Sequence, residues 1–161
     1  MNSLLRRKTL VFSAALILML ATQLVSAQQA SVLTSMQTPP PLPNPVLYLV
    51  EQEFYEANGK QWTRYKYSVE NFSIYPKELF AAAPDLPPCG TNTKSSRTWV
   101  DFYDQGGKRL YGFCALGSSA DLNKIWFALE VDVVPPSWVY IELNDRKTNT
   151  KYKSNLAETT Q

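Results

Sequence analysis

The chain contains no histidine, and this narrows the chemistry that its side chains can perform. Catalysis by Ser-His-Asp or Cys-His arrangements needs an imidazole, and many metal sites need one as well. The sequence also has no glycine-rich phosphate loop, and two cysteines alone cannot complete a structural zinc site. We therefore predict no catalytic residue, no metal site and no cofactor.

Paired carboxylates are the remaining catalytic option, because a glycosidase needs only two of them. Asp101 and Asp104 stand at a predicted hairpin, and Glu130 and Asp132 lie on the polar face of one predicted strand. We interpret both pairs as solvated surface residues. A shared cleft with two carboxylates about 5–10 Å apart would instead favour a small hydrolase.

Three aromatic residues are the best candidates for ligand contact. Trp126 alternates with apolar neighbours on one predicted strand, and Trp138 and Tyr140 do so on another. Outward-facing rings can stack on sugar faces or anchor a protein partner. The alternative is that these rings lie in a second layer or under loops. A coplanar, exposed pair would favour sugar binding, and burial of all three would exclude it.

Cys89 and Cys114 are the two cysteines of the chain. In an exported protein, two cysteines most simply form one disulfide. A redox or nucleophilic thiol is the alternative, but it needs a base to generate the thiolate. We therefore predict a Cys89–Cys114 disulfide.

The first 27 residues have the features of a secretory signal peptide. Arg6, Arg7 and Lys8 precede an apolar stretch, and Val25-Ser26-Ala27 supplies the small residues of a cleavage site. A retained anchor is the alternative, but the apolar stretch is shorter than the ~20 residues of a spanning helix. We expect export to a periplasm or the extracellular space, with no membrane span after cleavage.

Charge excludes one class of partner. Of the 16 basic residues, three lie in the signal, which leaves 13 basic and 14 acidic residues after cleavage. This balance is unlike that of a nucleic-acid-binding domain. The basic residues near the C-terminus are interpreted as a solvated edge strand, with contact to an anionic envelope polymer as the alternative. They are Arg146, Lys147, Lys151 and Lys153.

Short alternating runs of apolar and polar residues predict an all-β fold. Turn signals such as Asn58-Gly59 and Gly106-Gly107 separate them. Expected strands cover 46–55, 63–69, 97–103, 108–115, 125–133, 138–144 and 151–155, with helical turns at 77–83 and 118–123. About seven strands in this length indicate a single antiparallel β-sandwich. We assign residues 1–27 to the signal peptide, 28–44 to a proline-rich linker, 45–155 to the sandwich and 156–161 to a flexible tail.

The sandwich region resembles the fibronectin type III and immunoglobulin-like domains. The resemblance rests on the aromatic strand Trp62–Glu70, the Gly106-Gly107 hairpin and the late strand Trp138–Asn144. Fibronectin modules usually lack a disulfide, and the cysteine spacing is short for the usual immunoglobulin bridge, which leaves the strand order open. The segment from Pro87 to Cys114 is also similar to small exported bacterial proteins of unknown function.

These observations support two functional hypotheses. The first is an exported, non-catalytic β-sandwich module for protein interaction or envelope structure. The second is a carbohydrate-binding module that uses Trp126, Trp138 or Tyr140. The partner is accordingly an unknown protein or an envelope polysaccharide.

Overall fold

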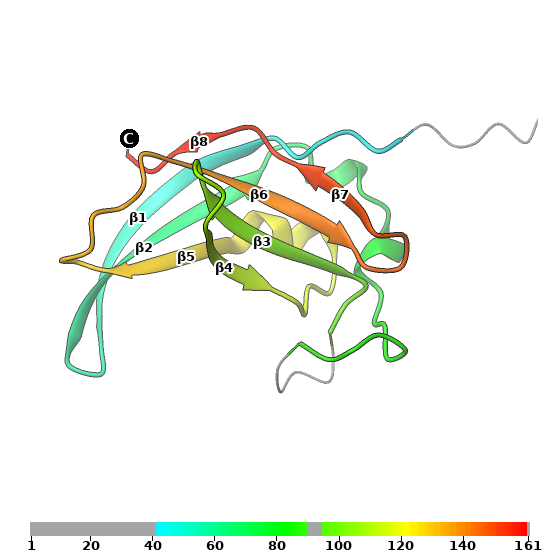
Figure 1. The fold of residues 1–161 in the computed structure, drawn as a ribbon, viewed down its shortest axis with the longest axis horizontal. Coiled ribbons are helices and arrows are strands. Elements are labelled where there is room, and N and C mark those ends of the chain that lie inside the picture. The colour runs from blue at the N-terminus through cyan, green and yellow to red at the C-terminus, as the bar shows by residue number, and fades with distance from the viewer. Residues whose placement is uncertain (1–40, 90–94, 161) are drawn as a thin grey trace, which may run out of the picture. The chain divides into compact units, whose positions relative to one another are not determined.

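Two antiparallel sheets make up the computed structural model, which describes residues 41–89 and 95–160 (Figure 1). The strands are β1 (Leu47–Ala57), β2 (Lys60–Val69), β3 (Thr98–Asp104), β4 (Arg109–Phe113), β5 (Ile125–Glu130), β6 (Trp138–Asp145), β7 (Thr150–Lys153) and β8 (Ala157–Glu158). Short 3-10 helices lie at η1 (Phe72–Ile74), η2 (Lys77–Phe80) and η3 (Ser119–Lys124). The predicted all-β sandwich is confirmed. The predicted signal peptide and residues 28–40 of the predicted linker lie outside the described residues.

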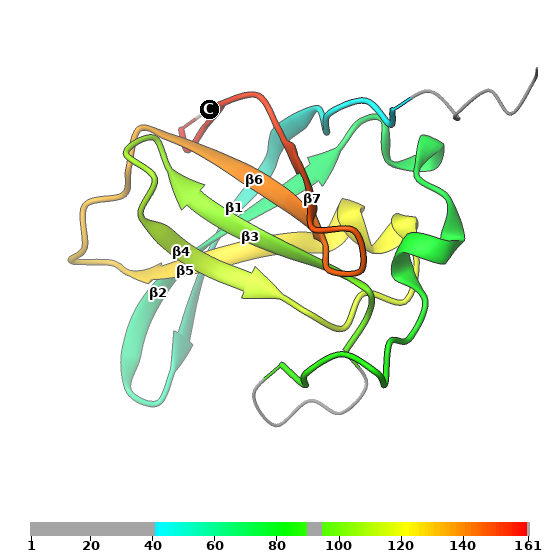
Figure 2. The ribbon, with the colours of Figure 1, turned by 45° about the vertical axis from the view of Figure 1, so that its right-hand side comes forward.

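The chain changes sheet at three connections. One sheet has the order β1-β2-β5, and the other has the order β4-β3-β6-β7, with β8 also paired to β6. The segments containing η1, η2 and η3 make the first two crossings, and the β5–β6 loop makes the third (Figures 1 and 2). As a result β4 and β5 are edge strands of different sheets that run side by side.

The inner faces of the two sheets form an aromatic core. Strand β2 buries alternate residues, as its sequence pattern predicts, and Tyr65 and Tyr67 are among them. The ring of Phe127 from β5 lies 4.9 Å from Tyr65 and 5.9 Å from Tyr67, measured between centroids. From the opposite sheet, Phe102 lies 5.5 Å from Phe127. Phe127 therefore contacts rings of both sheets.

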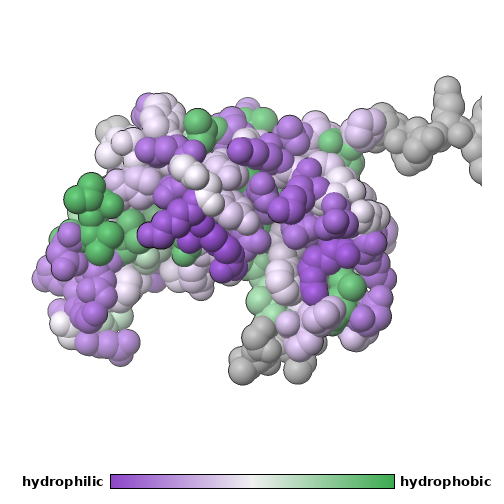
Figure 3. Space-filling model, viewed as in Figure 1, coloured by the Kyte–Doolittle hydropathy of each residue, from purple (hydrophilic) through white to green (hydrophobic). Residues whose placement is uncertain are grey.

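The outer faces are mostly polar. On the β4-β3-β6-β7 sheet, Arg109 pairs with Asp101 at 2.7 Å and Lys151 pairs with Glu142 at 3.0 Å. Figure 3 shows hydrophilic residues over much of this view and a hydrophobic area at its left end. Exposed ion pairs of this kind contribute little to stability, about 0–1 kcal/mol each.

Both ends of the domain pack more tightly than the sequence indicates. The linker assignment ran to residue 44, but Leu42 packs against the core and the carbonyl of Pro43 accepts a hydrogen bond from Tyr75 Oη at 2.8 Å. A tail was expected from residue 156, but Ala157 is buried and β8 pairs with β6. The hydroxyl of Tyr67 donates to the carbonyl of Glu158 at 3.2 Å. Residues 157–159 thus belong to the sandwich, because a core tyrosine and the edge of β6 both offer them hydrogen bonds.

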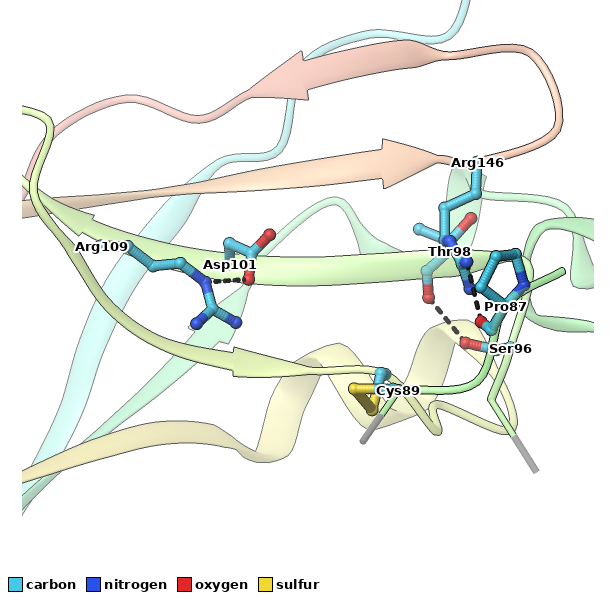
Figure 4. The surroundings of a disulfide bond; sticks show 8 residues. Pro87, Cys89, Ser96, Thr98, Asp101, Arg109 and Arg146 are labelled. Carbon is cyan, nitrogen blue, oxygen red and sulfur yellow. Dashed lines mark hydrogen bonds and ion pairs between the residues drawn. A yellow bond between two sulfur atoms is a disulfide. The ribbon is translucent and has the colours of Figure 1, made fainter. Parts of the chain in front are cut away.

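The disulfide joins Cys89 to Cys114, as predicted, with the two Cα atoms 6.0 Å apart. It fastens the segment after η2 to the chain just past β4 (Figure 4). Arg146 Nη2 donates to the carbonyl of Pro87 at 2.9 Å, and the Arg146 guanidinium lies 3.8 Å from the Trp99 ring centroid. Trp99 therefore packs under an arginine of the β6–β7 turn.

A charged pair joins the start of β3 to the end of β6. Asp145 is buried, and Arg97 Nε donates to its carboxylate at 2.6 Å. Burial acts to raise the pKa of Asp145, but hydrogen bonds from Arg97, Thr148 and the backbone N–H of Lys147 outweigh it and lower that pKa. The ionised carboxylate therefore stabilises the fold.

We expect Asp145→Asn to lower the free energy of unfolding at neutral pH by about 2–3 kcal/mol, because it leaves Arg97 without its anion. The stabilisation is present above the unfolded-state pKa of about 4 and is lost as the pH falls through the lower folded-state value. Urea denaturation between pH 7 and pH 2.5 checks this. Asp85→Asn, at an exposed ion pair with Lys147, is the matched control, and equal losses in both variants would contradict the assignment.

Candidate functional site

The described residues hold no cluster suited to a metal. Within ranges 41–89 and 95–160, no three His, Cys, Asp or Glu side chains come together as a cation site. In the same ranges, no helix has the length and apolar character to cross a membrane.

Three of the four candidate catalytic carboxylates, Asp101, Asp104 and Glu130, are held in surface hydrogen bonds or ion pairs. Asp101 accepts from Arg109, and the Asp104 carboxylate accepts from the backbone N–H of Lys108 at 2.9 Å. Glu130 and Asp132 line one shallow hollow, where Glu130 pairs with Lys60 at 2.5 Å. A glycosidase needs one protonated carboxylic acid as proton donor, whereas Glu130 is in an ion pair. This geometry does not favour hydrolysis.

Trp126 has neighbours on its ring. Tyr111 of β4 stacks on it with centroids 5.4 Å apart and planes inclined by 23°, and Phe113 meets it edge-on at 6.2 Å. The guanidinium of Arg64 lies 4.8 Å from its centroid. The rings of Tyr111 and Phe113 thus join β4 to β5 across the neighbouring edges of the two sheets, and Tyr111 stays 40% exposed. Trp126 therefore has a structural role where the edges of the two sheets meet.

Trp138 and Tyr140 lie on the other sheet, so the structure does not join them to Trp126 in one platform. Tyr140 is buried: its ring stacks on Tyr103 at 5.2 Å, and Lys153 Nζ lies 3.9 Å from its centroid. Trp138 is 40% exposed. Only Trp138 of the three predicted contact residues offers substantial free surface.

Three connections meet at one end of the sandwich. The β1–β2 hairpin turns at Asn58 and Gly59, both with positive φ, as the sequence predicts for a tight hairpin. The β5–β6 loop begins beside it, where the Val131 N–H donates to the carbonyl of Gln61 at 3.1 Å. The β3–β4 hairpin joins them, because Gln105 Oε1 accepts from the Trp138 N–H at 2.9 Å. These contacts link the β5–β6 loop to the base of the β1–β2 hairpin at its start and to the β3–β4 hairpin at its end.

Large apolar side chains are exposed at this end. Val134 is 89% exposed and Phe54 is 73% exposed, the highest values among the large apolar residues described. We define the apolar end as Phe54, Val131, Val133, Val134 and Trp138. Figure 3 shows hydrophobic surface at the left, where Figure 1 places the β5–β6 loop. Clustered exposed apolar residues mark interaction surfaces more often than single ones do.

Two hollows open beside these residues. One has a volume of about 400 Å³ and lies between the β3–β4 hairpin and the β5–β6 loop, with Leu110, Leu129, Pro135 and Pro136 among its lining. The other has a volume of about 340 Å³ and is lined by Phe54, Tyr55, Glu56, Gln61, Trp62 and Val131. Each can accept a side chain of a partner.

The sequence pattern missed most of the apolar end. Alternation predicted a strand through Val133, but β5 ends at Glu130 and the chain then turns, with the Val133 N–H bonded to the Glu130 carbonyl at 2.9 Å. The available signal was the run Val131–Pro136, since two consecutive prolines cannot continue a paired strand.

Comparison with known proteins gives no relative: no protein-family model matches the chain, and no curated protein or solved structure matches it.

Proposed function

We propose that this chain is an exported, non-catalytic β-sandwich that binds a protein partner through its apolar end. The exposure of Val134 and Phe54 together with two adjoining hollows carries the proposal. When a partner covers exposed apolar surface, the free energy falls by about 25 cal/mol per Å² of area removed from water. Interfaces take most of their affinity from a few such anchors seated in pockets.

Sugar binding receives less support from the same residues. A stacking platform needs a free ring face, and Trp126 and Tyr140 are covered by Tyr111, Arg64, Tyr103 and Lys153. Of the three predicted contact residues, Trp138 alone is an exposed large side chain, at 40% exposure. A protein partner therefore fits this surface better than a polysaccharide does.

Export is part of the proposal. The signal-like N-terminus supports it, and so does the disulfide, because such bonds persist in oxidising compartments such as a periplasm or the extracellular space. The fibronectin type III-like resemblance is likewise proposed. Its support is the two-sheet order in which β5 and β6, the strands of Trp126 and Trp138, belong to different sheets.

Affinity capture from the native extracellular or envelope fraction tests the proposal. We expect a protein recovered with the wild-type chain to fall about tenfold or more with Phe54→Ser/Val134→Ser, since anchor residues each contribute at least 1–2 kcal/mol. Ile74→Ser/Leu156→Ser is the matched control, because these two exposed apolar residues lie outside the apolar end. Equal recovery with both double variants, or recovery of glycan alone, would contradict it.

A further inference from the structure

The hollow at the β1–β2 hairpin has an apolar floor and an acidic rim. Phe54 and Val131 supply apolar surface, and Glu56, on the same face as Phe54, lines the same hollow. The register places the Trp62 side chain on the opposite face of the sheet. The adjoining hollow shares Val131 and Gln61 and adds Lys60, Glu130 and Asp132. The two hollows therefore meet at Gln61 and Val131, with Glu56 on the face of Phe54 and the Lys60–Glu130 pair on the opposite face of the sheet.

The lysine at these hollows, Lys60, is already in an ion pair. Lys60 pairs with Glu130 at 2.5 Å, and the two carboxylates beside it act to raise the pKa of Lys60. Among the described residues, neither Glu56 nor Asp132 has a cation within ion-pair distance. Glu56 and Asp132 thus keep uncompensated negative charge at the two hollows, and Glu56 lies on the face of the exposed Phe54 side chain.

We propose that the partner inserts an apolar side chain into the hollow between Phe54 and Val131 and places a lysine or arginine beside Glu56 and Asp132. This inference rests on the proposed function and names the chemistry of the protein segment that it binds. A volume of about 340 Å³ admits one or two side chains, and a flanking cation neutralises the rim.

Two other occupants fit less well. An anionic membrane would meet repulsion from the same rim carboxylates. In a two-fold contact of this surface with a second copy, the carboxylates of Glu56 and Asp132 would face those of the other copy and repel them. The charge pattern therefore favours a basic and apolar segment of another protein.

Selection of a displayed random peptide library on the immobilised, purified protein tests this inference. We expect enriched peptides to combine an apolar residue with an adjacent lysine or arginine. Their affinity should fall about three- to tenfold in Glu56→Gln/Asp132→Asn, the range for two exposed charge pairs, and should also weaken as NaCl rises from about 0.05 to 0.5 M. Glu70→Gln/Glu78→Gln, which removes the same charge outside the two hollows, should leave affinity unchanged.

The outcomes separate this inference from the proposed function. Peptides that need Phe54 but bind the rim variant and its control equally, or that are acidic, would overturn the inference alone. A selection that enriches no peptide sensitive to Phe54→Ser would count against both. Binding of phosphatidylglycerol vesicles that Phe54→Ser abolishes would overturn both in favour of a membrane surface.

Discussion

Replacing Phe127 with alanine is expected to lower the free energy of unfolding by about 3–5 kcal/mol. The side chain is 1% exposed and lies between the sheets, in contact with Tyr65, Tyr67 and Phe102. Truncation removes buried apolar area and the ring–ring contacts, and the neighbouring rings cannot move far enough to fill the space. The cavity term adds to the lost transfer free energy.

Chemical denaturation of wild type and variant measures this effect. Phe54→Ala is the matched control, because the same substitution at a 73% exposed position should change stability by less than about 0.5 kcal/mol. Similar losses for both variants would show that Phe127 is not central to the core.

Loss of the disulfide is the second large effect. We expect Cys89→Ser/Cys114→Ser to be less stable than the oxidised protein by about 3.5 kcal/mol, because the bridge closes a loop across a sequence separation of 25 residues in the unfolded chain. The hydrogen bond from the Ser96 N–H to the Cys114 carbonyl, at 2.8 Å, does not depend on the disulfide. We therefore expect the chain around Cys114 to keep its position in the variant below the melting temperature.

Guanidinium denaturation with and without dithiothreitol checks the bridge. The reduced wild type and the double variant should unfold at the same denaturant concentration, and the oxidised wild type should unfold at a higher one. An oxidised wild type no more stable than the double variant would contradict the expectation. Peptide or partner binding at the apolar end should persist in the variant, because the disulfide lies near Thr98, at the opposite end of β3 from Asp104.

Burial on one face made the strand positions predictable. In β2 the residues Thr63, Tyr65, Tyr67 and Val69 alternate with polar ones, and a slip of one residue would expose all four. The same alternation of apolar and polar residues made β3 and β6 predictable. The hairpin at Asn58-Gly59 was predictable because both residues accept positive φ.

Contacts between different sheets could not be predicted in this way. Tyr111 and Trp126 stack because β4 and β5 are neighbouring edges, and that arrangement depends on the order of all strands. The alternating pattern gives the face of a residue but not its partner in the other sheet. Trp126 was therefore predicted to face outward without any sign that Tyr111 and Arg64 would cover it.

The apolar end could not be predicted, because the residues after β5 continue the alternating pattern of the strand. Val131 and Val133 continue the period of β5, so the sequence predicted two more inward-facing strand residues. The paired register of β2 and β5 ends at Trp62 and Glu130. After the bond from the Val131 N–H to the Gln61 carbonyl the chain turns, with the Val133 N–H bonded to the Glu130 carbonyl. Without a partner strand the following residues form an exposed loop.

Site-specific photo-cross-linking can show whether a protein partner covers the apolar end. A benzophenone amino acid at position 134, inside the apolar end, is compared with the same group at position 74, an exposed apolar site outside it, in the cells that make the protein. We expect a covalent adduct with a distinct protein at position 134 and none at position 74. No protein adduct at position 134, or the same adducts at both positions, would contradict the proposed function.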